Sequence, residues 1–252
     1  MELEETGWLA EAVKLKFLGT RGEIDLRTRL HAMHSSAVVS YRGGQVTVDC
    51  GADWLDRVFA MRPRAIVLTH GHPDHAWGLK NGAPCKVFAT EETWTNLAGA
   101  PIADRAVVEP RKPFELNGIT FEAFPVRHSI RCPAVGYRIT AGRSAVFYVP
   151  DLVHIDDTHE ALRDIRMYIG DGASLTRPMV RRQGDQLFGH AAIRTQLTWC
   201  RSEEVPAAVF THCGSEIVGG DPAKMESAVR DLGSARGVNA RLAFDGLEII
   251  LP

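Results

Sequence analysis

The 252-residue sequence has no long hydrophobic run, no large excess of charge and no cysteine motif. No apolar stretch approaches the roughly 20 residues that are needed to cross a bilayer, so we expect no membrane partner. The 29 Lys and Arg residues nearly balance the 31 Asp and Glu residues, giving a formal net charge of −2. Because no overall basic field would attract nucleic acid or an anionic membrane, any phosphate recognition must be local.

The cysteines and the N-terminal residues bear on the cellular compartment. The five cysteines are odd in number and show no CxxC spacing, which argues against a disulfide framework and against a structural zinc knuckle. The opening segment Met1–Glu5 is acidic, whereas a signal peptide begins with basic residues. We therefore expect a cytoplasmic protein.

The composition is that of an ordinary globular chain, with 45% hydrophobic and 24% charged residues. No linker or low-complexity stretch divides the chain, so we expect one domain over residues 1–252. Apolar and alternating runs predict strands at 13–18, 36–41, 45–49, 65–68, 86–89, 114–116, 120–126, 134–140, 145–149, 167–170, 207–211 and 241–251. Helical spacing predicts helices at 53–61, from about 91, 157–164, 191–201 and 222–232. Two strand-rich halves that each carry helices predict an α/β fold, a four-layer αββα sandwich.

A cluster of imidazole and carboxylate groups directly follows the predicted strand 65–68. It comprises His70, His72, Asp74 and His75 in the run His-Gly-His-Pro-Asp-His. These groups suit zinc, manganese or iron(II), and one loop with four of them can hold two ions. The alternative is a polar surface loop or a helix cap at Asp74.

The run Thr69–His75 resembles the signature loop of the metallo-β-lactamase superfamily. That family places a histidine, a bridging aspartate and a final histidine after later strands, and the matching runs here are Val126-Arg127-His128-Ser129, Tyr148-Val149-Pro150-Asp151 and Phe210-Thr211-His212-Cys213. The resemblance implies one ion held by His70, His72 and His128, a second held by Asp74, His75 and His212, and Asp151 between them. Taken alone, His128 and His212 would more often be ordinary loop histidines, and Asp151 a turn former. The resemblance thus implies two divalent cations, zinc or manganese, as cofactors.

Further stretches are similar to the ribonuclease Z and PhnP-type phosphodiesterase branch of that superfamily. They are Phe17–Gly22 with Arg27–Arg29, and His128–Ile130 with Val135–Ile139. Gly189-His190-Ala191-Ala192 resembles the motif that carries the branch's extra catalytic histidine, although a histidine near a helix N-terminus is the simpler alternative.

Two features depart from that branch. Only 22 residues separate His128 from Asp151, which leaves no room for the tRNA-gripping arm of bacterial ribonuclease Z. PhnP-type enzymes carry an accessory cysteine-rich zinc site near the N-terminus, whereas residues 1–49 contain no cysteine.

The expected chemistry follows from the two cations, which roughly 3.5–4 Å apart can share a water and generate a bridging hydroxide as the nucleophile. Asp74 and Asp151 would orient that nucleophile, and His190 would protonate the leaving alkoxide. Guanidinium groups bind phosphate through paired donors. The candidate substrate contacts are therefore Arg21, Arg27, Arg29, Arg177, Arg181 and Arg182. A solvated charged loop explains each arginine equally well.

We therefore predict a metal-dependent hydrolase, a phosphodiesterase acting on a small or cyclic phosphodiester, a nucleotide or a nucleic-acid end, with a homodimer allowed. The main alternative is a lactonase, thioesterase or β-lactamase-type hydrolase, because one fold supports several chemistries. An oxygen-reducing diiron protein is disfavoured, since that branch resembles HxExD and His72 occupies the glutamate position. A third possible class of function is a metal-stabilised binding or biosynthetic accessory protein that no longer turns over a substrate.

Overall fold

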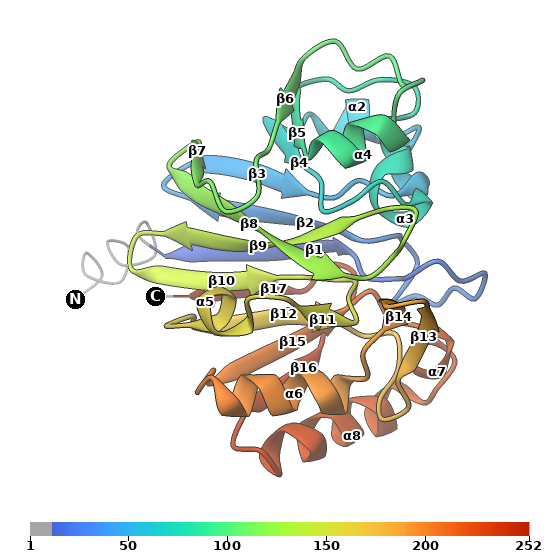
Figure 1. The fold of residues 1–252 in the computed structure, drawn as a ribbon, viewed down its shortest axis with the longest axis vertical. Helices are drawn as coiled ribbons and strands as arrows, with labels where there is room; N and C mark the ends of the chain where they lie inside the picture. Colours follow the sequence, from blue (N-terminus) through green and yellow to red (C-terminus); the bar gives the residue numbers. More distant parts are fainter. Residues whose placement is uncertain (1–11, 252) are drawn as a thin grey trace.

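Two β-sheets pack face to face in the computed structural model, which describes residues 12–251, and helices cover the outer faces of both sheets (Figure 1). The predicted αββα sandwich is confirmed. The acidic segment Met1–Glu5 lies outside the described residues.

The first sheet has the strand order β17-β1-β2-β3-β4-β5-β6. Its strands are β1 (Val13–Gly19), β2 (Ser36–Tyr41), β3 (Gly44–Val48), β4 (Ala65–Val67), β5 (Lys86–Ala89), β6 (Arg105–Val107) and β17 (Glu248–Leu251). β17, β1, β2 and β3 pair antiparallel, and β3 to β6 pair parallel. The connections of this half contain η1 (Ala52–Trp54), α2 (Val58–Met61), α3 (Pro73–Ala76), η2 (Trp77–Leu79) and α4 (Glu91–Asn96).

The second sheet has the strand order β11-β8-β9-β10-β12-β15-β16, and β7 pairs with β8. Its strands are β7 (Phe114–Leu116), β8 (Ile119–Arg127), β9 (Ala134–Ala141), β10 (Ser144–Tyr148), β11 (His154–Ile155), β12 (Met167–Asp171), β15 (Ala207–Thr211) and β16 (Asn239–Leu242). β10, β12, β15 and β16 run parallel. The helices of this half are α5 (Thr158–Leu162), α6 (Ile193–Ser202), α7 (Ser215–Val218) and α8 (Pro222–Ser234).

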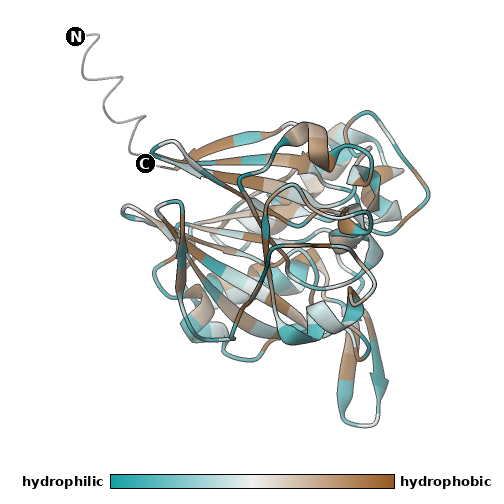
Figure 2. Ribbon diagram, turned by 90° about the horizontal axis from the view of Figure 1, so that it is seen from above, coloured by the Kyte–Doolittle hydropathy of each residue, from teal (hydrophilic) through white to brown (hydrophobic). Residues whose placement is uncertain are grey.

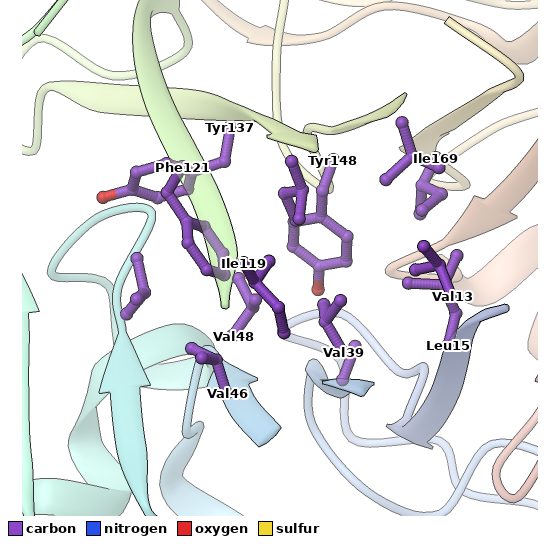
Figure 3. Packing of buried hydrophobic residues seen from close by; sticks show 14 of the residues in the cluster. Val13, Leu15, Val39, Val46, Val48, Ile119, Phe121, Tyr137, Tyr148 and Ile169 are labelled. Carbon is purple, nitrogen blue, oxygen red and sulfur yellow. The ribbon is translucent and has the colours of Figure 1, made fainter. Parts of the chain in front are cut away.

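Three hydrophobic clusters hold the four layers together. The first lies between the sheets, where alternate residues of the first sheet, such as Leu15 and Val39, meet Phe121 and Tyr148 of the second (Figure 3). The other two clusters join each sheet to its own helices. Because a fully buried aliphatic or aromatic side chain stabilises the fold by about 1.5–3 kcal/mol, this alternation fixes which face of each strand points inward.

A two-stranded hairpin stands outside both sheets. It consists of β13 (Met179–Gln183) and β14 (Gln186–His190), and Figure 2 shows it extending away from the sandwich. The expectation that Arg177 to Arg182 form a loop is wrong for Arg181 and Arg182, which lie in β13. The turn contains Gly184, whose positive φ of 59° favours glycine.

Two predicted elements are divided in the structure. The predicted strand 241–251 is wrong as a single strand, because β16 lies in the second sheet and β17 in the first. The chain passes between the sheets at Asp245-Gly246, where the Asp245 carboxylate accepts a hydrogen bond from Thr20 Oγ1 at 2.7 Å and Gly246 has a φ of 94°. The predicted helix 53–61 is likewise two short helices, η1 and α2. The Asp53 carboxylate in η1 is held by the backbone N–H of His34 at 2.9 Å, so a tertiary contact decides the local geometry.

Candidate metal centre

All seven predicted metal ligands lie just beyond the carboxyl ends of strands. His70, His72, Asp74 and His75 follow β4, His128 follows β8, Asp151 follows β10, and His212 follows β15. Most of their side chains are buried, and that of His72 is partly exposed. The strand ends thus bring together residues from both halves of the chain, as loops at sheet edges commonly do.

The first cluster consists of three imidazoles and one carboxylate. His70 Nε2 lies 3.0 Å from His72 Nδ1, and His128 Nε2 lies 3.1 Å from that same nitrogen. Asp151 Oδ2 lies 3.6 Å from His70 Nε2. One atom from each of these four residues lies within 4.8 Å of the others, so the group can hold a metal ion.

The second cluster contains two carboxylates and two imidazoles. His212 Nε2 lies 2.8 Å from Asp74 Oδ2, and His75 Nε2 lies 3.4 Å from the same oxygen. Asp151 Oδ2 lies 3.4 Å from His75 Nε2 and 3.5 Å from His212 Nε2. Asp151 therefore belongs to both clusters, which is the position that a bridging ligand requires.

The hydrogen bonds on the outer edges of the rings fit a bound cation. His70 Nδ1 lies 3.1 Å from Thr69 Oγ1, and His128 Nδ1 lies 3.1 Å from the Gly189 carbonyl oxygen. When each Nδ1 donates to its partner, Nε2 presents a lone pair to the centre. His75 Nε2 is buried and has no hydrogen-bond partner among the described residues. A zinc or manganese ion bound here would accept these converging lone pairs, including that of the unpartnered His75 Nε2.

Asp49 is a site residue that the sequence analysis missed. Its Oδ2 accepts a hydrogen bond from His75 Nδ1 at 2.9 Å, and its Oδ1 accepts one from the Thr69 backbone N–H at 2.8 Å. Asp49 has a φ of 62° and His212 a φ of 53°. Non-glycine residues in this region store strain that is typical of functional sites. The available signal was an aspartate directly after the apolar strand β3.

His190 lies beside the second cluster, and a second missed carboxylate holds it there. His190 Nδ1 lies 2.8 Å from Asp151 Oδ1 and 2.9 Å from Asp171 Oδ2. Asp171 ends β12 and is itself fixed by Gln196, whose Oε1 accepts the Asp171 backbone N–H at 2.9 Å. Gly189 has a φ of 111° and leaves no room for a Cβ against the Met179 carbonyl oxygen, so the turn before His190 needs glycine.

The pKa values are lowered for the histidines of the first cluster and raised for His190 beside the second cluster. Burial and the neighbouring His128 lower the pKa of His72 to about 4, and burial also lowers the pKa of His70 and of His128. Burial lowers the pKa of His190 as well, but the charges of Asp151 and Asp171 outweigh it and raise the pKa to about 11. His190 Nδ1 donates to Asp171 Oδ2, and the nearby charges of Asp171 and Asp151 favour the doubly protonated ring, which also carries a proton on Nε2.

A cavity of about 700 Å³ opens over the centre. This volume suits a small substrate or one nucleotide. Its lining includes His72, His128, Asp151, His190 and His212, together with Arg177 and Glu23. Glu23 was not among the predicted site residues. His190 is 24% exposed, and its Nδ1 is occupied by the carboxylates, so Nε2 is the nitrogen available to a substrate.

The six candidate arginines divide into different environments. Arg21 is only 1% exposed and donates to Asp53 Oδ2 at 2.5 Å, so its prediction as a substrate contact is wrong. Arg27 is 52% exposed and pairs with Asp53 Oδ1 at 2.8 Å, and Arg29 lines a separate cavity. Arg177 lines the catalytic cavity, whereas Arg181 and Arg182 are exposed on β13.

Comparison with known proteins supplies the family. The family model for the β-lactamase superfamily domain matches residues 45–213, which contain all seven predicted ligands. The chain belongs to the β-lactamase superfamily. Its His and Asp clusters are able to hold metal ions. The curated proteins yielded no match by sequence.

Several solved structures share the superfamily fold over nearly the whole chain. The metallo-β-lactamase fold protein YhfI from Bacillus subtilis is 15% identical with a TM-score of 0.72, covering 95% of this chain and 99% of that chain. A diphosphatase of the PhnP family is 20% identical with a TM-score of 0.69, covering 95% and 97%. The short form of human tRNase Z is 16% identical with a TM-score of 0.62, covering 95% and 99%. Among the described residues, no helix is long and apolar enough to traverse a bilayer.

Proposed function

We propose that this superfamily member is a dinuclear metal-dependent phosphodiesterase of the ribonuclease Z and PhnP-type branch. The observation that carries the proposal is the place of His190, whose Nδ1 donates to Asp171 Oδ2 and lies 2.8 Å from Asp151 Oδ1, while the ring borders the cavity over the metal clusters. An acid beside the metal clusters is most useful for a poor leaving group such as an alkoxide. A PhnP-family diphosphatase and a tRNase Z among the structural neighbours support the same reading.

Each part of the centre has a defined task in this reaction. Two zinc or manganese ions, when bound, would lower the pKa of a shared water and offset charge on the phosphoryl oxygens. His70, His72 and His128 would hold one ion, Asp74, His75 and His212 the other, and Asp151 both. Asp49 keeps His75 Nδ1 protonated, so that Nε2 faces inward. His190 donates its Nε2 proton to the leaving oxygen, and Asp171 holds the ring in place.

The substrate of this proposal is a phosphodiester, including a nucleotide or a nucleic-acid end. The unpaired state of the five cysteines suits a reducing cytoplasm. A lactonase, thioesterase or β-lactamase-type activity is the rival, because the metal clusters alone would serve it equally well.

The test combines metal content with a leaving-group series. His190→Ala should lose roughly 10²–10⁴ in kcat on alkyl or ribose phosphodiesters, while elemental analysis still finds close to two metals per chain. The same variant should lose far less on p-nitrophenyl esters, because nitrophenolate leaves without a proton. Asp151→Ala is the matched control, since it should lower metal content and all activity together. A wide preference of the wild type for lactones or thioesters would overturn the proposal.

A further inference from the structure

The β13–β14 hairpin is fixed to the catalytic centre at its base. The Gly189 backbone N–H donates to the His128 carbonyl oxygen at 2.8 Å, and His128 Nδ1 lies 3.1 Å from the Gly189 carbonyl oxygen. One end of the hairpin is therefore anchored to a predicted metal ligand, and the other end extends beyond the sandwich (Figure 2).

The pairing register shows which hairpin residues share a face with His190. Residues directly opposite each other in an antiparallel pair point to the same side, and alternate residues along a strand do too. Met179 pairs with His190, and Arg181 pairs with Phe188. These four side chains therefore share one face.

The next pair along the hairpin belongs to the opposite face. Arg182 pairs with Leu187, so these two side chains point away from the His190 side. The cavities agree with this division. Met179 and His190 line the catalytic cavity, whereas Leu187 lines a different cavity with Ile130 and Pro133. Two consecutive arginines of β13 thus face different surroundings.

Arg181 and Phe188 lie on the same hairpin face as the cavity-lining Met179 and His190, one pair farther along the hairpin. They lie two residues along their strands from Met179 and His190, which is about 7 Å. Arg181 is exposed and Phe188 half-buried. Neither Arg181 nor Arg182 has a carboxylate partner among the residues that the structure describes. A guanidinium group beside an aromatic ring offers paired donors to a phosphate and a flat surface to a base.

We propose that Arg181 and Phe188 form a nucleotide platform that binds the nucleoside unit adjoining the scissile phosphate. This inference rests on the proposed phosphodiesterase function and narrows its substrate to phosphodiesters that carry a nucleoside, such as a dinucleotide or a single-stranded nucleic-acid end. Phe188 stacks on the base, and Arg181 contacts a phosphate oxygen. Arg182 lies on the reverse face and does not take part.

The experiment compares two esters that share the nitrophenolate leaving group, using metal-loaded full-length protein. Thymidine 5′-(p-nitrophenyl phosphate) carries a nucleoside, and methyl p-nitrophenyl phosphate does not. Phe188→Ala should lower kcat/KM on the thymidine ester about tenfold and leave the methyl ester unchanged, because only the thymidine ester has a base to stack. Arg181→Ala should lower kcat/KM on both esters, because both carry the phosphate that Arg181 contacts. Arg182→Ala removes the same charge from the same strand and should change neither rate. Phe188→Leu keeps an apolar side chain without the ring, so its loss would report stacking and not misfolding.

Binding of thymidine 5′-monophosphate, measured by calorimetry, separates the platform from the reaction. Weaker binding in Arg181→Ala but not in Arg182→Ala, with no hydrolysis of either ester by the wild type, would support the platform and reject the phosphodiesterase. Hydrolysis of both esters with equal losses in the two arginine variants would reject the platform and keep the phosphodiesterase. Replacing the thymidine ester by a pentathymidylate ester distinguishes the two sources of the nucleoside. A higher kcat/KM on the longer ester supports a strand end, and an equal value supports a dinucleotide.

Discussion

The six candidate arginines form two groups in the sequence, and these groups have different environments in the structure. The first group is Arg21, Arg27 and Arg29, and the second is Arg177, Arg181 and Arg182. The guanidinium groups of Arg21 and Arg27 both pair with the Asp53 carboxylate, and neither residue lines the cavity over the metal clusters. The second group runs from Arg177, which lines that cavity, into the exposed strand β13. Arg21 and Arg27 therefore stabilise the protein through Asp53, whereas Arg177 borders the cavity and is accessible to a bound molecule.

The difference comes from what each loop contacts. The Arg21 backbone N–H donates to the Met33 carbonyl oxygen at 2.9 Å, and Gly22 N–H donates to the Cys213 carbonyl oxygen at 3.1 Å. A Cβ at Gly22 would lie 3.0 Å from His212 Cε1, so this loop packs directly against a predicted ligand. Because this loop packs against the metal clusters, its arginine side chains form ion pairs within the protein and are not free to bind a substrate.

The largest expected effect that tests this difference is on stability. Arg21→Ala would leave the Asp53 carboxylate, only 12% exposed, without its buried partner. Breaking a buried ion pair in this way costs about 3–5 kcal/mol, so we expect Tm to fall by roughly 10 °C. Thermal unfolding measures the change. Turnover per folded molecule should stay close to that of the wild type.

The double variant Arg21→Ala/Asp53→Asn provides the control. Because it removes the orphaned charge together with its partner, it should be less destabilised than the sum of the two single variants. An Arg21→Ala protein with normal Tm and a raised KM for phosphodiesters would restore Arg21 as a substrate contact.

Local sequence patterns predicted most strands of the fold, but not the sheet that each strand joins, because contacts between distant residues determine that. Alternation along 36–41 predicted β2 with the observed bounds. The segment 241–251 is mostly apolar on both sides of Asp245-Gly246, and only that pair signals that the chain leaves one sheet for the other. Local periodicity reports which face of a strand is buried, but it carries no information on which sheet the strand joins.

The residues of the two metal-binding clusters could be proposed from the sequence because four of them lie within six positions and the others follow strands in a family order. Asp49 and Asp171 were not predicted, since a single aspartate after a strand is also a common turn residue. Their role depends on His75 and His190, which are distant in sequence and are brought close by folding. The structural role of Arg21 was not predicted for the same reason, because its partner Asp53 lies 32 residues away in the sequence.

The next effect in size concerns the second arginine group. Arg177→Ala removes a guanidinium from the wall of the catalytic cavity. A charged hydrogen bond is worth about 1.5–3 kcal/mol, so kcat/KM on phosphodiesters should fall at least tenfold, mainly through KM. Tm should change by no more than about 2 °C. Arg29→Ala is the matched control, because Arg29 lines a separate cavity. Equal kinetic losses in both variants would mean that general charge, and not position, governs substrate binding.

A smaller effect is expected for Arg27, which shares the Asp53 carboxylate with Arg21. Arg27 is 52% exposed, so its ion pair is screened by water and salt. Arg27→Ala should cost less than about 1 kcal/mol, and the cost should shrink further at 1 M salt. Chemical denaturation at low and high salt measures it. If Arg27→Ala destabilised the protein as much as Arg21→Ala, burial would not be what distinguishes the two pairs.

The smallest effect is the pH dependence that Asp53 contributes. Burial raises the pKa of Asp53, but hydrogen bonds from Arg27, the charge of His34, the His34 backbone N–H and Arg21 outweigh it, so the pKa lies below its ordinary value. A lowered folded-state pKa stabilises the protein above the unfolded pKa of about 3.9, and this contribution disappears as pH falls through the folded value. The Tm difference between wild type and Asp53→Asn should therefore be constant near neutral pH and shrink below about pH 4. In an Arg21→Ala background the same difference should be smaller at every pH, because one source of the lowered pKa is gone. A difference that stayed constant down to pH 3 would show that Asp53 ionises alike in the folded and unfolded chains, and that its arginine partners position the loop without stabilising the charge.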